Sequence, residues 1–297
     1  MSAAARRLLK AAAALLLILA LVTGVMAWRL AGSFIAGANR AVTMPADFPA
    51  ETVIIPGEGR TVAGSWRDLG DASPVVLLVH GAGGDRRSTL PRARLMVDAG
   101  FSVLLIDLQA HGETPGETIT FGWRESADVR AAHHWIRTQA PGRRVAAIGV
   151  SMGGAAILLG PQPAGFDAVV IEAAYPRIED AIRNRLAQRA GAMSLVLSPM
   201  LRWQLQPRVG VGADDLQPIH SIAKLGAPVL VVGGTRDAYT PESETRALFD
   251  AARSPKLLWL VPGASHQDFS RFDPAGYRDR VIGFLESTLM ADAQIRP

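Results

Sequence analysis

A serine between glycines is the first group in this sequence that could do chemistry, in Gly149-Val150-Ser151-Met152-Gly153. A serine hydroxyl becomes a nucleophile when a sharp turn projects it toward a base, and flanking glycines remove the Cβ atoms that would clash there. The apolar run before it, Val145–Val150, predicts a buried strand, and the small apolar segment after it, residues 154–159, predicts a helix. This context predicts that Ser151 is a nucleophile; the alternative is a glycine-rich turn without chemistry.

A serine nucleophile needs a base, and the sequence offers six histidines. His266 follows the last apolar strand, in Pro262-Gly263-Ala264-Ser265-His266. Ligands of open α/β sheets bind at the carboxyl ends of the strands, so we expect His266 to be the base, rather than a hydrogen-bonded loop histidine. The other five lie within a predicted helix, within an insertion, or in loops, where they are weaker candidates (His80, His111, His133, His134 and His220).

The base must be oriented by a carboxylate that also leaves a strand end, between serine and histidine in chain order. Asp237 meets both conditions, because it follows the apolar run 228–232. Glu172 ends the preceding strand and is the alternative. We expect Asp237 to fix the tautomer of His266 and to stabilise its charged form.

The oxyanion of the reaction should be held by backbone N–H groups. Met152 directly follows the nucleophile and supplies one of them. The other is expected from Ala82, in the glycine-rich loop His80-Gly81-Ala82-Gly83-Gly84. An ordinary tight turn is the alternative interpretation of this loop.

Strands and helices alternate along most of the chain, which predicts a mainly parallel α/β sheet covered by helices on both faces. A hairpin of two short strands, separated by Pro56-Gly57-Glu58-Gly59, precedes this pattern. The expected strands are residues 52–55, 61–66, 75–79, 101–106, 145–150, 168–171, 228–232 and 257–261. The expected helices are residues 88–99, 124–139, 242–252 and 277–289.

An insertion at about residues 175–224 interrupts the alternation. It combines apolar residues with six arginines (Arg177, Arg183, Arg185, Arg189, Arg202 and Arg208). Its position above the carboxyl ends of the strands favours a lid over the site, and the alternative is a helical pair that packs on the domain. We expect the arginines to form a solvated helix face rather than an anion site.

The N-terminus carries the basic balance of the chain. The net charge is +4, but residues 1–40 hold five basic and no acidic side chains, which leaves −1 for the rest. Nucleic acid is therefore an unexpected partner. The absence of cysteine excludes disulfides, thiolate catalysis and cysteine-ligated metals.

Residues 11–28 contain no charged side chain and would span about 27 Å as a helix, nearly the thickness of a bilayer core. We expect an uncleaved membrane anchor with its basic end in the cytoplasm, and hence an exported domain, periplasmic or extracellular. The alternative is a secreted protein with a signal peptide cleaved after Val25-Met26-Ala27. The expected division is an anchor and tether over residues 1–40, the tether beginning at residue 31, and one domain over residues 41–297.

The order Ser151, Asp237, His266, together with His80-Gly81-Ala82-Gly83-Gly84, resembles the α/β-hydrolase family over about residues 50–290. The short insertion and the segments Asp107–Gly112 and Val261–His266 resemble in particular the Bem46-like membrane-anchored serine hydrolases and dienelactone-hydrolase relatives. In the loop after Asp107, Gln109 and Ala110 stand where these relatives often have Arg and Gly, which leaves the path of that loop open.

The resemblance implies hydrolysis of an ester, thioester or amide through an acyl-enzyme, without a metal or an organic cofactor. We expect a carboxylic ester hydrolase acting on small-molecule or lipid-like acyl esters. A peptidase or acyltransferase with the same triad is the second hypothesis. A non-catalytic binding protein on this scaffold is the third.

Overall fold

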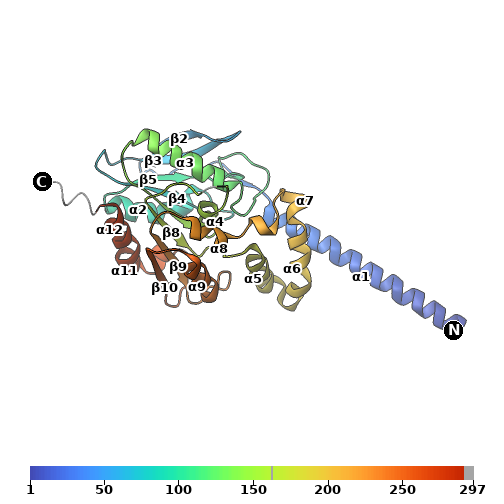
Figure 1. Cartoon of the computed structure of the whole chain (residues 1–297). Helices are drawn as coiled ribbons and strands as arrows, with labels where there is room; N and C mark the ends of the chain where they lie inside the picture. Colours follow the sequence, from blue (N-terminus) through green and yellow to red (C-terminus); the bar gives the residue numbers. More distant parts are fainter. Residues whose placement is uncertain (162, 291–297) are drawn as a thin grey trace.

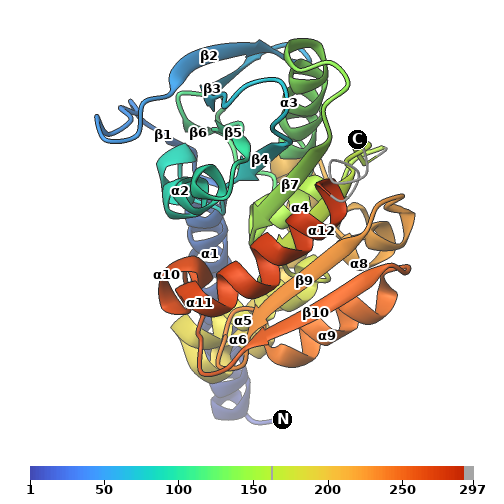
Figure 2. The same cartoon turned by 90° about the vertical axis from the view of Figure 1, so that its left-hand side faces the viewer.

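One twisted sheet of eight strands forms the centre of the computed structural model, which describes residues 1–161 and 163–290 (Figures 1 and 2). The strand order is β10-β9-β8-β7-β4-β5-β3-β2. The hairpin β2–β3 is antiparallel and joins β5 in antiparallel orientation, and all other pairs are parallel. The strands are β2 (Glu51–Pro56), β3 (Thr61–Arg67), β4 (Val75–Val79), β5 (Ser102–Ile106), β7 (Val145–Val150), β8 (Ala168–Glu172), β9 (Val229–Gly234) and β10 (Lys256–Val261). The predicted α/β fold with a mainly parallel sheet is confirmed.

Helices cover both faces of this sheet (Figure 2). One face packs against α3 (Glu125–Gln139), α4 (Met152–Leu158) and α9 (Glu242–Ala251). The other packs against α2 (Leu90–Asp98) and the C-terminal helices. These are α10 (Phe269–Phe272), α11 (Pro274–Tyr277), a π-helical turn (Arg278–Ile282) and α12 (Gly283–Leu289).

The central strands are continuous apolar runs because both of their faces are buried. Every residue of β4 is fully buried, and burial of each such side chain contributes about 1.5–3 kcal/mol. β4 and β7 pair in parallel, with Val79 opposite Gly149. This register places the carboxyl ends of the two strands, and so the loop after His80 and the turn at Ser151, next to each other.

The insertion folds into short helices above the carboxyl ends of the strands. They are α5 (Ile178–Ala190), α6 (Ser194–Trp203), α7 (Leu205–Val209) and α8 (Pro218–Ser221), with 3-10 turns at Gly191–Met193, Ala213–Asp215 and Ile222–Lys224. In Figure 1, α5, α6 and α7 lie on the side of the domain from which the N-terminal helix projects, and Figure 2 shows α5 and α6 beside that helix.

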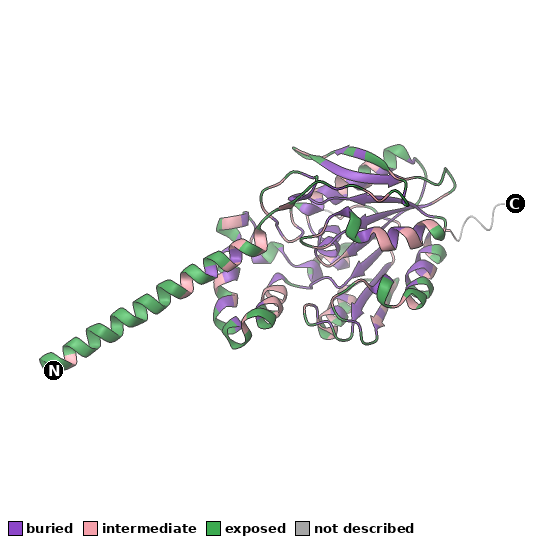
Figure 3. Ribbon diagram, turned by 180° about the vertical axis from the view of Figure 1, so that it is seen from behind, coloured by how far each residue is buried: buried purple, intermediate pink, exposed green. Residues whose placement is uncertain are grey.

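The N-terminal helix α1 (Ala3–Ile35) has 33 residues and is solvent-exposed over most of its length (Figure 3). Its last turns dock on the insertion: Ala27 and Ala31 are buried against Leu186, Leu197 and Leu201. The helix therefore continues through residues 31–35, where we expected the tether to begin. Apolar side chains near its end find an apolar partner surface in the insertion, and such tertiary packing outweighs local propensity.

The chain after α1 also joins the domain. Strand β1 (Ala38–Asn39) pairs in parallel with β6 (His111–Gly112), in the loop after β5. The boundary between an anchor with its tether and a separate domain at residue 41 remains a prediction.

Candidate active site

Ser151, His266 and Asp237 form a continuous chain of hydrogen bonds at the carboxyl edge of the sheet. His266 Nε2 lies 3.2 Å from Ser151 Oγ, and His266 Nδ1 lies 2.7 Å from Asp237 Oδ2. The three residues follow the ends of β7, β9 and β10, strands that lie in one sheet but are distant in sequence. With Nδ1–H donating to the carboxylate, Nε2 presents a lone pair to the serine hydroxyl.

Ser151 occupies a strained turn between β7 and α4. Its φ is +53° and its ψ is −117°, a conformation that L-residues rarely adopt. A Cβ on Gly149 would lie 2.6 Å from the Gly154 nitrogen, and one on Gly153 would lie 2.4 Å from the Val79 carbonyl oxygen. Both flanking glycines are therefore required by backbone contacts around the turn.

The Asp237 carboxylate is buried and fully engaged. Its Oδ1 accepts hydrogen bonds from the backbone N–H groups of Tyr239 and Thr240, at 2.8 and 2.9 Å. Its Oδ2 is left to face His266. These bonds fix the side chain so that one oxygen points at the imidazole.

Glu172, the alternative acid, lies in a different network. One of its carboxylate oxygens accepts hydrogen bonds from Arg92 at 2.6 and 3.0 Å, and the other accepts one from the Tyr277 hydroxyl at 2.7 Å. All three side chains are buried, and Asp268 adds a second ion pair to Arg92 at 3.1 Å. The structure therefore does not bring Glu172 to His266.

The expected oxyanion donors, Ala82 and Met152, both border the space in front of Ser151. Met152 is the first residue of α4, so its N–H has no partner within the helix. The Ala82 N–H donates to no acceptor among the residues that the structure describes. Both groups are therefore free to bind a developing negative charge.

The histidines of the loops, His80 and His111, hold backbone rather than face Ser151. The N–H of Leu108 donates to His80 Nε2 at 3.1 Å, and the N–H of Gly83 donates to His111 Nε2 at 2.9 Å. Both rings must then be neutral, with Nδ1–H donating to a carbonyl oxygen. Burial lowers the pKa of His80 from 6.5 to about 3 and also lowers the pKa of His111.

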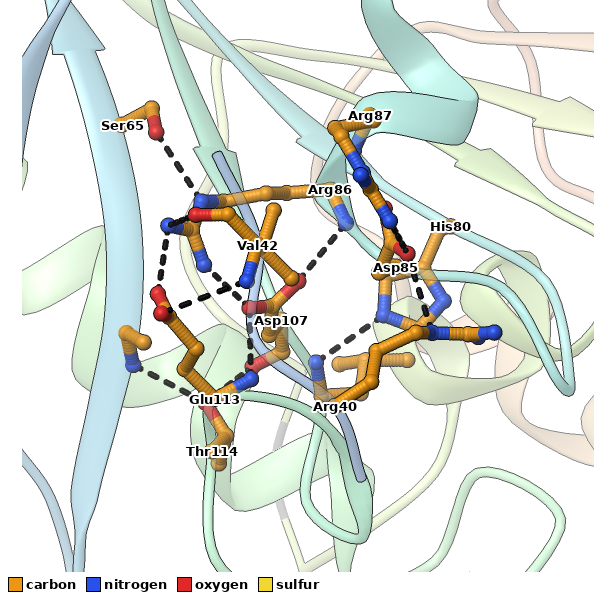
Figure 4. Close-up of polar contacts among 12 residues, drawn as sticks. Arg40, Val42, Ser65, His80, Asp85, Arg86, Arg87, Asp107, Glu113 and Thr114 are labelled. Atoms are coloured by element: carbon orange, nitrogen blue, oxygen red, sulfur yellow. Dashed lines mark hydrogen bonds and ion pairs between the residues drawn. The ribbon is translucent and has the colours of Figure 1, made fainter. Parts of the chain in front are cut away.

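Ion pairs also hold the glycine-rich loop after His80 and the residues that follow it (Figure 4). The buried Arg86 pairs with Asp107 and, at 2.6 Å, with Glu113. Arg40, just after β1, pairs with Asp85 at 3.0 Å and donates to the Gly83 and Gly84 carbonyl oxygens. The segment that follows the N-terminal helix is thus bonded directly to the loop that carries Ala82.

Two cavities meet at Ser151. The first, the apolar cavity, lies between the sheet edge and the insertion and is lined mainly by apolar side chains, among them Phe121, Ile178 and Leu205. Helix α1 supplies part of its wall through Ala31, Phe34 and Ile35. This part of the wall could not be predicted from the sequence, because it depends on the docking of α1.

The second cavity, the polar cavity, extends from Ser151 toward the glycine-rich loop and α2. Its lining includes Ser88, Thr89, Arg92 and Asp268. Within residues 1–161 and 163–290, no cluster of three or more His, Asp or Glu side chains is arranged to hold a metal ion. The expected independence from metals and cofactors remains a prediction.

Comparisons with known proteins show the family and the fold. The model of the alpha/beta hydrolase family matches residues 76–280. The chain belongs to this family. Among its relatives is the uncharacterized protein Rv2307c of Mycobacterium tuberculosis, 31% identical over 232 residues, which cover 76% of this chain and 75% of that protein. The uncharacterized protein YqkD of Bacillus subtilis is 27% identical over 221 residues, or 73% of this chain and 72% of that one.

Solved structures show the same fold. The esterase Pf2001 of Pyrococcus furiosus superimposes with a TM-score of 0.70 at 20% identity, over 86% of this chain and 98% of that one. A thermophilic esterase from Thermogutta terrifontis gives 0.58 at 18% identity, over 81% and 100%. At these identities the likeness concerns the architecture, and the reaction must be argued from the site.

Proposed function

We propose that this protein is a serine hydrolase that cleaves carboxylic esters through an acyl-enzyme. The observation that supports it most is the hydrogen-bonded chain from Ser151 Oγ through His266 to the buried Asp237 carboxylate, at 3.2 and 2.7 Å. A hydroxyl on a strained turn, facing an oriented imidazole, is the arrangement of an activated nucleophile.

In the proposed reaction, Ser151 Oγ attacks the ester carbonyl carbon while its proton moves to His266 Nε2. The carbonyl oxygen becomes an oxyanion that the N–H groups of Ala82 and Met152 bind. The carbon–oxygen bond to the alcohol then breaks, and His266 returns the proton to the departing alcohol. Water, deprotonated by His266, then attacks the acyl-enzyme. The bond from the acyl carbon to Ser151 Oγ breaks, the acid leaves, and His266 returns the proton to Ser151 Oγ. Asp237 stays ionised and stabilises the imidazolium in both halves.

The shape of the site supports apolar acyl groups as substrates. The apolar cavity would hold the acyl chain, and the polar cavity would hold the alcohol. The insertion above Ser151 would act as a lid, since α5 and α7 form part of the cavity wall. The solved esterases with this fold add support for ester chemistry.

We further propose that α1 anchors the enzyme in a membrane, with the catalytic domain exported. The helix is long and apolar enough to cross a bilayer, a property that a signal sequence shares. Beside it, α6 exposes an apolar stripe that includes Val196, Pro199 and Trp203. Positions 196, 199 and 203 lie on one helix face. A bilayer around α1 would cover this stripe, as the resemblance to membrane-anchored serine hydrolases also suggests.

The test is labelling of the full chain, in a nonionic detergent, with a fluorophosphonate probe. Wild type should be labelled and should hydrolyse p-nitrophenyl esters, and Ser151→Ala should do neither. Ser198→Ala is the matched control, because Ser198 lies on α6 and donates only to the Ser194 carbonyl oxygen. A folded wild type that is neither labelled nor active would refute the proposal and favour a binding protein.

The same assay separates the related activities. Formation of a new ester on addition of an alcohol acceptor would identify an acyltransferase. Cleavage of peptide amides at rates comparable to esters would identify a peptidase.

A further inference from the structure

Arg185 stands at the junction of the two cavities that meet at Ser151. Only four of the described residues line both cavities, and they are Ala82, Ser151, Arg185 and His266. Three of them are the expected nucleophile, base and oxyanion donor. The fourth is a cation on α5, contributed by the insertion. A substrate that occupies both cavities with its ester at Ser151 would therefore lie near a guanidinium.

This guanidinium has no counter-ion. Among residues 1–161 and 163–290, no carboxylate lies within ion-pair distance of Arg185 and no hydrogen-bond acceptor is in reach. Its contact is with the ring of Tyr239, 4.7 Å from the centroid, and that ring meets His266 edge to face. The Asp237 carboxylate interacts electrostatically with Arg185 only at longer range, and this carboxylate is already hydrogen-bonded to His266. Burial lowers the pKa of Arg185, although an arginine stays charged at any physiological pH.

The other two arginines among the described residues that line the cavities already have hydrogen-bond partners within the protein, although only Arg92 has a counter-ion. Arg92 in the polar cavity pairs with two carboxylates, those of Glu172 and Asp268, and is therefore not free to bind an anion. Arg208 in the apolar cavity donates to the Trp28 carbonyl oxygen at 2.6 Å and to Gln204. No acidic residue lines the apolar cavity, so the charge of Arg185 is not balanced from that side either. Arg185 is partly buried and its nitrogens are not among the buried unsatisfied atoms of the described residues, so the guanidinium is accessible from the cavities and available to an anionic group of a ligand.

We propose that Arg185 binds an anionic group on the alcohol part of the substrate, which makes the substrate an amphiphilic acyl ester of a phosphate-bearing alcohol. The acyl chain lies in the apolar cavity against α1, the ester at Ser151, and the phosphate against Arg185 at the entrance of the polar cavity. This inference rests on the proposed ester hydrolysis and adds its substrate class. Arginine suits this role because its planar fork can donate two hydrogen bonds to one phosphate.

The test compares two esters with the same acyl chain, 1-myristoylglycerol 3-phosphate and 1-myristoylglycerol, in mixed micelles of a nonionic detergent. Wild-type full chain should prefer the phosphate ester. Arg185→Gln should lower kcat/KM for the phosphate ester about 10- to 100-fold, as expected for loss of a charge-assisted hydrogen bond, and change the neutral ester by less than about threefold. Arg185→Lys should keep part of the preference.

Arg183→Gln is the matched control. Arg183 lies on the same helix, is exposed, and pairs with Asp180 at 2.5 Å. It should leave both rates unchanged. A second pair, the same two esters with a butyryl chain, distinguishes a membrane lipid from a soluble phosphorylated ester. A preference for the phosphate ester in either pair supports the role of Arg185. Faster hydrolysis of the myristoyl pair would identify a membrane lipid as the substrate, and faster hydrolysis of the butyryl pair a soluble ester.

Two results would overturn the inference. A wild type that hydrolyses both esters equally would show that no anion is recognised. An equal fall for both esters in Arg185→Gln would show that Arg185 only supports Tyr239 and His266. Both leave ester hydrolysis intact, whereas a wild type that cleaves neither ester and resists the fluorophosphonate would reject the proposed function itself.

Discussion

The two sides of the space in front of Ser151 are built in different ways. The sheet side consists of groups that directly follow strand ends, so strand pairing alone sets their positions. The opposite side consists of α1 and the insertion, and its contacts are between helical segments that no strand pairing positions, such as the hydrogen bond between Arg208 and Trp28. Neither α1 nor the insertion belongs to the sheet.

This difference suggests a division of tasks. The rigid sheet edge can hold reacting groups to the accuracy that catalysis requires. The helical side can vary its apolar and charged residues without disturbing that geometry. Variants of the sheet edge should therefore change kcat, and variants of the helical side should change selectivity among substrates.

The largest effect is expected for Asp237→Asn, on the sheet edge. An amide in place of the carboxylate favours the wrong tautomer of His266 and cannot stabilise the imidazolium. We expect kcat for a p-nitrophenyl ester to fall about ten-thousandfold with the fold retained.

Glu172→Gln is the contrasting variant, because Glu172 also ends a strand but bonds to Arg92. The buried arginine keeps Asp268 but loses one carboxylate, so the free energy of unfolding should fall by about 1–3 kcal/mol. Active-site titration would show an unchanged kcat per folded molecule. A ten-thousandfold loss of kcat here, with little loss at Asp237, would reverse the assignment of the acid.

Substitution of His80, at the end of β4, tests how the sheet edge affects the pH dependence of the free energy of unfolding. Its pKa is about 3 in the folded protein and 6.5 in the unfolded chain, so the unfolded state binds more protons between these values. Stability is then complete above pH 6.5 and decreases as the pH falls toward 3. Between pH 7 and pH 5 the wild type should lose about 2 kcal/mol more than His80→Gln, as measured by urea unfolding. His220→Gln, at an exposed position, should keep the wild-type dependence, and an equal dependence in His80→Gln would contradict this account.

The smallest effect is expected where the two sides meet, at Arg40. Its side chain binds the carbonyl oxygens of Gly83 and Gly84 but is 42% exposed, so its contribution is on the order of 1 kcal/mol. Arg40→Ala should lower kcat about fivefold with little change in KM, because the loop that carries Ala82 becomes less rigid.

Arg87→Ala is the control for Arg40→Ala. Arg87 pairs with the same Asp85, at 2.8 Å, and is equally exposed, but it does not bond to the glycine carbonyls. If both variants lost the same activity, the effect would come from Asp85 and not from the loop.

The sheet edge could be predicted from the sequence because its signals are local. The run Val145–Val150 has the predicted bounds, and the strands at β4, β8, β9 and β10 begin or end within about two residues of expectation. Because Ser151, Asp237 and His266 each follow the end of a parallel strand, their position at one edge of the sheet could also be predicted. The roles of these residues await the experiments above.

The helical side could not be predicted in this way. Residues 31–50 as a whole have many small and polar side chains, which predicts a tether, and only the apolar surface of the insertion explains why α1 continues to Ile35. The arginines of the insertion were expected as one solvated face. The structure separates them, with Arg183 exposed and Arg185 and Arg208 lining a cavity. Helical periodicity does not tell which side of a short helix faces a cavity formed by other segments.

The docking of Ala27 and Ala31 on the insertion has an evolutionary consequence. Leader and anchor segments are usually free to exchange one apolar residue for another, because lipid accepts any of them. Here the two alanines, one helical turn apart, face Leu197 and Leu201, and a larger side chain at either position would push the helix off the domain. The last turns of α1 should therefore drift as slowly as a protein core, and their substitutions should be accompanied by compensating changes in α6.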